Sequence, residues 1–219
     1  MNPLNQKIVL PSEKPIGILA DSHGQVSTLE AAIDVLYQKG CQTIIHLGDI
    51  CDSSCIHTAD ESIHLIQKNN IIAIKGNNDH SLTVSGDPRI SPSTHHYLKK
   101  LPLVVHTQHI LFTHSLPFMK ELGLSCMIQQ LNDNHIHLFF GNGPEQKILF
   151  RGHNHQPELV TQNHQHFQRM PLNFPTHIQL TPLKPFIMTC GAVLNSHCGI
   201  FYPESFVFHG ILLNSTSAF

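Results

Sequence analysis

Residues 16–24, IGILADSHG, place a short aliphatic run directly before a turn that contains an aspartate, a histidine and a glycine. Runs of four to eight such residues, bounded by turn-forming residues, are typical of buried strands. The following segment, 27–40, spaces Leu29, Ile33 and Leu36 along one helical face. A strand followed at once by an amphipathic helix indicates the start of an α/β fold.

The ends of this first helix also carry sequence signals. Ser27 and Glu30 have the spacing of a capping box, and Gly40 is placed to end the helix. Two further helices are expected at about 54–68 and about 119–132, where isoleucine and leucine recur at helical spacing.

Short apolar runs of the same kind recur through the chain, at 43–47, 71–75, 109–113, 147–151, 186–190 and 205–213. Residues 101–114, LPLVVHTQHILFTH, predict a hairpin, and the polar, turn-rich segment 81–96 predicts a loop. The alternation of strands and helices in the first half predicts an α/β protein whose first strands are parallel, and the second half is strand-rich.

The composition is that of a soluble globular protein. Of the 219 residues 41% are hydrophobic, and no apolar run approaches the roughly 20 residues of a membrane span. We expect a single domain over 1–219, with 1–14 as an N-terminal extension. A cytoplasmic location is expected because the first residues lack the apolar core of a signal peptide, and the 6 cysteines, without C-x-x-C spacing, are expected to be reduced.

Polar residues follow five of the predicted strands. Those with metal-binding or catalytic chemistry are Asp21, His23, Asp49, Asp52, Asn77, Asn78, His80, His114, His153 and His155. Ligand sites in α/β sheets form where strand C-termini open into loops, so these side chains can converge on one pocket. Oxygen and imidazole ligands suit manganese, iron or zinc, and a set this large fits two ions that share a bridging ligand.

The His-x-His pair at 153–155 has little significance by itself. Segments 135–137 and 164–166 show the same spacing in a chain with 19 histidines. Segment 153–155 differs because it follows a predicted strand, because Gly152 is expected to permit a tight turn before it, and because the earlier strand ends supply the other ligands.

Five motifs occur in order: D-x-H at 21–23, G-D-x-x-D at 48–52, G-N-x-D at 76–79, a lone His114 after a strand, and G-H-x-H at 152–155. Together they resemble the motifs of the calcineurin-like metallophosphoesterase superfamily, and the chain is most similar to its small single-domain bacterial and archaeal phosphodiesterases and phosphatases. The resemblance implies a four-layer α-β-β-α sandwich of two mixed sheets flanked by helices.

The resemblance also implies the metal ligands: Asp21, His23 and His155 at one ion, Asn77, His114 and His153 at the other, and Asp49 as the bridge. Two divalent ions are therefore the expected cofactors, manganese first, with iron, zinc, cobalt and nickel as alternatives. Such a pair activates a bridging water for the hydrolysis of phosphomonoester or phosphodiester bonds.

The chain departs from the protein phosphatase branch of that superfamily. Ser53 and Asn78 stand where that branch has an arginine and a histidine. Asp52 therefore lacks its usual partner, His80 is the nearest spare imidazole that could protonate a leaving group, and Asn78 is a candidate contact for the substrate phosphate. Arg151 could point into the fold or into the site, and the fold is favoured.

We expect the substrate to be a phosphate ester of a small-molecule or nucleotide type. A formal charge of -2 and only 13 Lys and Arg leave no basic surplus for an extended nucleic acid, and no membrane partner is expected. The oligomeric state is left open, with a homodimer among the possibilities. Three other functions are kept as alternatives: a non-catalytic metal-binding or scaffold protein of the same fold, a protein phosphatase, and a nuclease.

Overall fold

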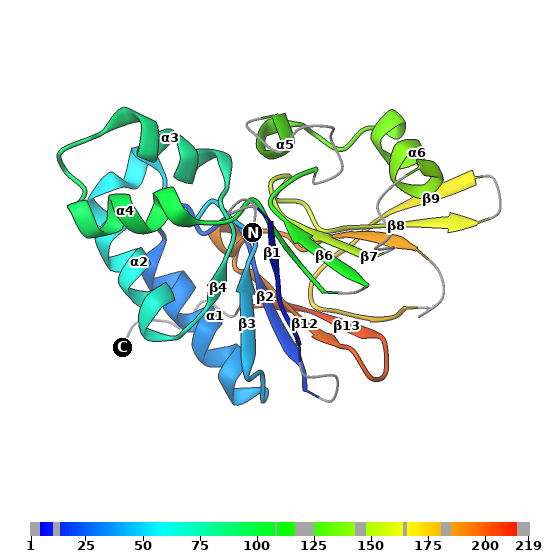
Figure 1. Cartoon of the computed structure of the whole chain (residues 1–219). Coiled ribbons are helices and arrows are strands. Elements are labelled where there is room, and N and C mark those ends of the chain that lie inside the picture. The colour runs from blue at the N-terminus through cyan, green and yellow to red at the C-terminus, as the bar shows by residue number, and fades with distance from the viewer. Residues whose placement is uncertain are drawn as a thin grey trace.

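A computed structural model describes residues 5–10, 14–107, 109–116, 125–142, 148–163, 166–180 and 185–213. Within these ranges the chain forms two mixed β-sheets packed face to face, with helices on both outer faces (Figure 1). This arrangement confirms the four-layer sandwich that the sequence predicts.

The first sheet contains the parallel strands that open the chain. Over the described ranges its strand order is β10 (Thr176–Gln179), β13 (Val207–Leu212), β12 (His197–Tyr202), β2 (Ile16–Leu19), β3 (Thr43–His46) and β4 (Ile72–Ala73). β2, β3 and β4 are parallel, and β12 runs antiparallel to β2. The predicted parallel first half is therefore confirmed.

The second sheet, in the part of the chain that is described, has the order β1 (Asn5–Lys7), β5 (Val104–His106), β6 (Ile110–Thr113), β7 (Ile148–Arg151), β11 (Phe186–Thr189), β8 (Glu158–Asn163) and β9 (His166–Pro171). β5 and β6 are antiparallel, which confirms the predicted hairpin, whereas β6, β7 and β11 are parallel. β1 comes from the predicted N-terminal extension and pairs with β5.

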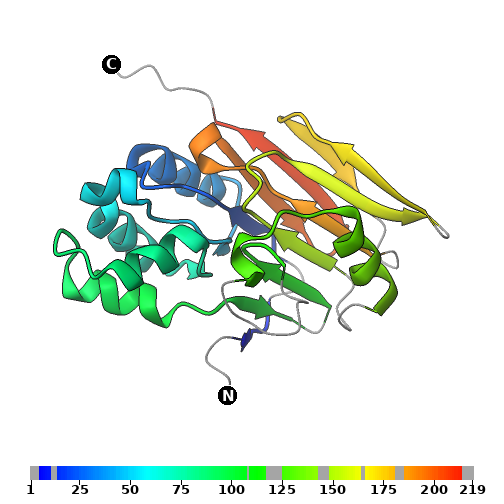
Figure 2. The ribbon, with the colours of Figure 1, turned by 90° about the horizontal axis from the view of Figure 1, so that it is seen from above.

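The helices are α1 (Val26–Gln38), α2 (Ala59–Lys68), α3 (Asn77–Ser85), α4 (Pro92–Lys100), α5 (Ser125–Ile128) and α6 (Asp133–Asn142), with 3-10 turns η1 (Ser53–Thr58) and η2 (Val193–Asn195). Figure 1 shows α1 to α4 together on one side of the molecule and α5 and α6 on the other, and Figure 2 shows the same separation from above. Of the helices described, none has the length and apolar character needed to cross a membrane.

Three apolar clusters fill the three interfaces of the sandwich. One, with Leu29 and Ile63, joins α1 and α2 to the first sheet. The second, with Phe150, lies between the two sheets, and the third packs Phe139 of α6 against Leu149 of the second sheet. The middle cluster sets the position of one sheet against the other. It therefore also sets the relative positions of the strand ends of the two sheets.

The predicted capping box of the first helix is wrong. α1 begins at Val26, so Ser27 already lies inside the helix, and the N-cap residue Gln25 makes no side-chain cap hydrogen bond. The N-cap lies two residues earlier than predicted, in a turn after β2 that the Gln25 N–H closes by donating to the Ser22 carbonyl. Gly40, with a φ of 85°, follows the helix as predicted.

The predicted loop at 81–96 is also wrong, because α3 and α4 occupy most of it. Ser91 is the N-cap of α4, where its hydroxyl accepts from the Thr94 N–H, and Pro92 takes the first helical position. These are recognisable helix-start signals inside a segment whose polar composition indicated a loop.

The other predicted helices are reproduced unevenly. Segment 54–68 is helical, as η1 followed by α2. Of 119–132, residues 119–124 lie outside the described ranges, and α5 covers only Ser125–Ile128. α6 was not predicted.

Phe150 offers a direct test of the middle core. Its ring is fully buried and lies 5.6 Å from the ring of Phe112 in the same sheet and 5.0 Å from that of Phe201 in the other, centroid to centroid. We expect Phe150→Ala to lower the free energy of unfolding by about 3–5 kcal/mol, measured by urea denaturation, because it opens a cavity between the sheets. Phe167→Ala, at a half-buried position on β9, should lower the free energy of unfolding by about 1 kcal/mol. Equal losses in the two variants would contradict a central role for Phe150.

Candidate metal centre

The polar turns after the strands meet at one end of the sandwich. The Asp21 N–H donates to the Gly48 carbonyl at 3.0 Å, and the His23 N–H donates to the Asp49 carbonyl at 3.0 Å, so the turns after β2 and β3 are joined by backbone hydrogen bonds. The Gly152 N–H donates to the carbonyl of His114 at 3.1 Å and joins the turns after β6 and β7. The structure thus brings all seven predicted metal ligands together.

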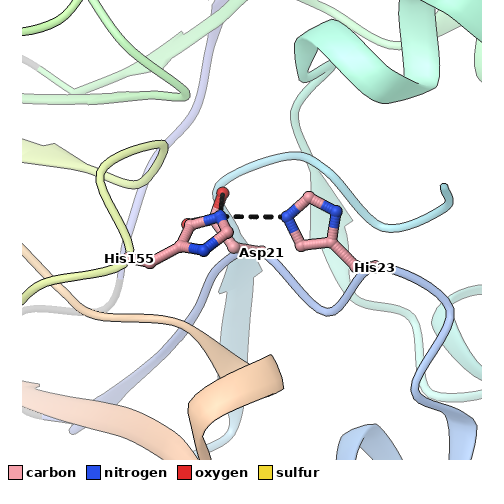
Figure 3. A group of neighbouring side chains, drawn as sticks. All are labelled: Asp21, His23 and His155. Atoms are coloured by element: carbon pink, nitrogen blue, oxygen red, sulfur yellow. Dashed lines mark hydrogen bonds and ion pairs between the residues drawn. The ribbon is translucent and has the colours of Figure 1, made fainter.

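The first group of ligand atoms comes from Asp21, His23 and His155 (Figure 3). The two imidazoles face each other with 3.0 Å between their Nε2 atoms, and Nε2 of His155 lies 3.7 Å from Oδ1 of Asp21. Asp21 is fully buried, and its carboxylate accepts the His153 N–H. This donor set can hold one cation.

The second group consists of Asn77, His114 and His153. Nε2 of His114 lies 3.0 Å from Oδ1 of Asn77 and 3.1 Å from Nδ1 of His153. Atoms bound at right angles to one ion, at the usual ligand distance of about 2.1 Å, are about 3 Å apart, so these separations are those of a shared ligand shell.

Asp49 lies between the two groups. Its Oδ2 atom is 3.8 Å from Nε2 of His23 and 3.5 Å from Nε2 of His114. A carboxylate in this place can reach a cation on either side, which is the bridging position that the sequence resemblance implies.

The outer nitrogens of the second pair determine which nitrogens are free to bind metal. Nδ1 of His114 donates to the Leu47 carbonyl at 2.9 Å, and Nε2 of His153 donates to the Ile128 carbonyl at 3.2 Å. Because a carbonyl oxygen can only accept, these two contacts place the protons of the neutral rings on the outer nitrogens, and Oδ1 of Asn77, also an acceptor, then faces Nε2 of His114 with no proton between them. The facing atoms, Nε2 of His114 and Nδ1 of His153, are then both bare lone pairs.

Two lone pairs at this distance repel each other unless a positive charge lies between them. A proton is disfavoured there: burial lowers the pKa of His114, and burial with the neighbouring His114 lowers the pKa of His153 to about 4. A divalent cation removes the repulsion without protonating either ring. The donor set therefore fits the metal ions that the motifs imply.

The carboxylates lead to the same conclusion. Burial, and then the charge of Asp49, raise the pKa of Asp21 well above its ordinary range, and burial with Asp49 raises the pKa of Asp79 to about 7. Three buried carboxylates thus lie close enough to oppose one another's ionisation, and cations between them would favour the ionised forms.

Asp52 has a hydrogen-bond partner that the sequence did not predict. Its Oδ2 atom accepts from Nδ1 of His23 at 2.8 Å, which leaves Nε2 of that ring free toward the site. Its Oδ1 atom accepts from the backbone and hydroxyl of Ser54, at 2.7 and 2.8 Å. Asp52 therefore orients a predicted ligand, and this contact differs from the pairing with a histidine that the protein phosphatase branch has.

Asn78 and His80 differ in their relation to the site. The Asn78 side-chain amide donates to Oδ2 of Asp49 at 2.7 Å, and its backbone N–H donates to Oδ1 at 2.8 Å, so Asn78 holds the central carboxylate from two directions. His80 is half-buried on α3, and over the described ranges its imidazole makes no hydrogen bond to a site residue.

Sequence reasoning missed the role of Asp79. This buried carboxylate accepts four backbone N–H groups, from Asp49, Ile50, Cys51 and Gly76, at 2.9–3.0 Å. It therefore holds the turn after β3 against the start of α3. Its position three residues after the helix N-cap Gly76 was the available signal, because an acidic residue there commonly accepts the N-cap N–H.

The backbone of the site is strained where the ligands are. Five predicted ligands have left-handed φ values between 46° and 71°: Asp21, His23, Asp49, His153 and His155. Residues other than glycine rarely adopt this conformation, and they do so mainly at functional sites. Gly152 does not have a positive φ. The chain turns tightly after it, with the Asn154 N–H donating to the Gly152 carbonyl at 2.9 Å, and an added Cβ at Gly152 would lie 2.8 Å from Oδ2 of Asp21.

A two-sheet sandwich with groups of histidine and carboxylate ligands at its strand ends is the arrangement expected of a metallophosphoesterase. A family model described as the calcineurin-like phosphoesterase superfamily domain matches residues 15–171. The chain belongs to the calcineurin-like phosphoesterase superfamily and is a phosphoester hydrolase of a family that uses divalent metals.

Solved structures share the fold. A metallophosphoesterase from Sphaerobacter thermophilus matches with a TM-score of 0.72 and 18% identity, over 92% of this chain and 88% of its own. A Pyrococcus horikoshii protein has a TM-score of 0.61 and 16% identity, over 92% and 89%, and an archaeal phosphodiesterase has 0.51 and 16%, over 91% and 100%. No curated protein matches the sequence.

The buried side chain of His46 predicts how the stability of the protein depends on pH. It is fully buried below the centre, where its Nε2 bonds Ser22 Oγ at 2.9 Å, and burial with the nearby His114 lowers its pKa to about 3. Between pH 6.5 and 3 only the unfolded chain protonates this ring, so its contribution to stability is lost as the pH falls through 6.5. In EDTA we expect a loss from this residue of roughly 2 kcal/mol between pH 7 and pH 5.

The comparison is made with His46→Gln, which cannot titrate. Urea unfolding of both proteins at pH 7 and pH 5 isolates this histidine, because the opposing contributions of Asp21 and Asp79 are present in both. The variant should lose less stability than the wild type over this range. Equal losses would contradict a neutral, buried His46.

Proposed function

We propose that the protein is a dinuclear metal-dependent phosphoesterase that hydrolyses phosphomonoester or phosphodiester bonds of a small-molecule or nucleotide-type substrate. The observation that carries the proposal is the pair of bare, facing nitrogens of His114 and His153, beside a carboxylate of Asp49 that also faces His23. Manganese is proposed first among the ions that accept these ligands, with iron, zinc, cobalt and nickel next.

Different residues of the chain hold different parts of such a centre. Asp52 and the carbonyls of Leu47 and Ile128 hold three imidazoles in the tautomer that turns a bare nitrogen inward. Asn78 and Asp79 hold the central carboxylate and its turn. When bound, two divalent ions supply Lewis acidity toward the phosphoryl oxygens and lower the pKa of a coordinated water.

The choice of a small substrate rests on charge and on the departures from the protein phosphatase pattern. The chain has 13 Lys and Arg against 15 Asp and Glu, which favours a compact phosphate ester over an extended nucleic acid. Ser53 and Asn78 replace the arginine and histidine of the protein phosphatases, and Asn78 is engaged with Asp49. A scaffold role has less support, because the ligand set is complete.

Activity assays test the proposal directly. Metal-free protein reconstituted with Mn²⁺ should hydrolyse p-nitrophenyl phosphate, bis(p-nitrophenyl) phosphate or both, and Asp49→Asn should reduce this turnover at least about a hundredfold, because it weakens the shared ligand. Asp34→Asn makes the same chemical change at an exposed position on α1 and should keep wild-type rates.

A phosphopeptide and a single-stranded DNA, assayed beside the aryl esters, separate the alternatives. Turnover confined to the phosphopeptide would favour a protein phosphatase, and turnover confined to DNA a nuclease. The absence of Mn²⁺-dependent turnover on every substrate, together with an Asp49→Asn variant that behaves as wild type, would overturn the proposed activity and favour the scaffold alternative.

The role of Asp52 yields a further prediction. Because it accepts the Nδ1 proton of His23, we expect Asp52→Asn to weaken Mn²⁺ binding or activity by about 10–100-fold, measured by calorimetric titration and by turnover. Wild-type Mn²⁺ affinity in this variant would contradict the positioning role.

The role of His80 as the acid that protonates the leaving group stays a prediction from the sequence. If it donates that proton, His80→Ala will slow the hydrolysis of phenyl phosphate more than that of p-nitrophenyl phosphate, because phenol is the poorer leaving group. Equal rate changes on the two esters would remove His80 from this role.

A further inference from the structure

Arg151 is a buried charge that the proposed reaction does not use. It ends β7 immediately before Gly152, and its side chain is fully buried. Within the described residues no carboxylate lies within ion-pair distance of its guanidinium. A buried charge without such a partner costs stability compared with a packed apolar side chain, so packing alone does not account for an arginine here.

The guanidinium donates to four neutral acceptors on three strand ends. Nε and Nη2 donate to the carbonyl and hydroxyl oxygens of Ser115 at 3.3 Å each, and Nη2 also donates to Oδ1 of Asn154 at 3.2 Å. Nη1 donates to the hydroxyl of Thr189 at 3.3 Å. The planar fork of an arginine can reach acceptors in several directions at once, whereas a lysine ammonium is a single point.

Two of these partners adjoin predicted metal ligands. Ser115 follows His114, and Asn154 separates His153 from His155. One side chain thus ties the turn after β6 to the turn after β7, and these two turns supply three of the predicted ligands. Thr189, at the end of β11, anchors the same guanidinium from a third strand.

A second route connects the guanidinium to His153. The Ser115 hydroxyl, which accepts from Arg151, donates to the Gln129 carbonyl at 2.5 Å. The preceding carbonyl, that of Ile128, accepts the Nε2 proton of His153. The network therefore ends at the hydrogen bond that leaves Nδ1 of His153 bare toward the site.

We propose that Arg151 is a positioning residue that locks the turns after β6 and β7 together and thereby sets the affinity for the ion expected between His114 and His153. The inference rests on the proposed function and deepens it. It concerns how the ligands are held, because the hydrogen bonds of the guanidinium go to Ser115, Asn154 and Thr189 and, in the described part of the chain, to none of the predicted ligands.

Calorimetric titration of the metal-free protein with Mn²⁺ measures this role without an activity assay. We expect Arg151→Met, which is similar in length but has no donors, to weaken the affinity for at least one Mn²⁺ ion by about 10–100-fold. Arg151→Lys keeps the charge but loses the fork, so it should give an intermediate loss. Arg169→Met, at a more exposed arginine paired with Glu158 on the outer hairpin, is the matched control and should bind as wild type.

Asn154→Ala separates positioning from stability. It removes one half-buried amide next to the ligands and keeps the buried charge, so the unfolding temperature in EDTA should stay near the wild-type value while Mn²⁺ affinity falls. If Arg151→Met does not fold, this variant and Arg151→Lys carry the test.

Wild-type Mn²⁺ affinity in all the folded variants, whatever their stability, would overturn the positioning role and leave the proposed function intact. A wild-type protein that binds no Mn²⁺ would instead overturn the proposed function, and this inference with it.

Discussion

The position of the Asp49 carboxylate is the constraint on which the centre depends. Four backbone N–H groups donate to Asp79, and this shapes the turn that carries Asp49, while Asn78 donates twice to the carboxylate itself. The result places one oxygen between His23 and His114, which come from different sheets.

The centre therefore combines two packing units. β2, β3 and β4 supply its ligands from one sheet, and β6 and β7 supply the others. The apolar layer around Phe150 sets the distance between the sheets, together with the hydrogen bonds from the His153 N–H to Asp21 and from His114 to the Leu47 carbonyl. The electrostatics are equally interdependent, since buried carboxylates and bare imidazole nitrogens oppose one another until cations lie between them. Stability and metal binding are thus coupled through the same residues.

Much of the fold, and the group of residues that meet at the strand ends, could be predicted, and the misses have physical causes. Aliphatic runs that precede Asp21 and His114 identify the strand ends, because a buried strand must be apolar and a site must be polar. The loop prediction at 81–96 failed because composition was weighed above the cap at Ser91. The left-handed backbone of His153 and His155 was not predicted, because it is a strain that only surrounding contacts can sustain.

The sequence by itself determined the first strands and helices, β2, α1, β3, α2 and β4, and the chemical types at the strand ends, because these depend on local periodicity and on the identity of side chains. Tertiary structure decided which nitrogen of each histidine is free, since that depends on carbonyls from distant segments such as Leu47 and Ile128. It also turned Asp52 toward His23 and buried Arg151 among neutral acceptors. Such contacts join residues far apart in the chain, and no local pattern encodes them.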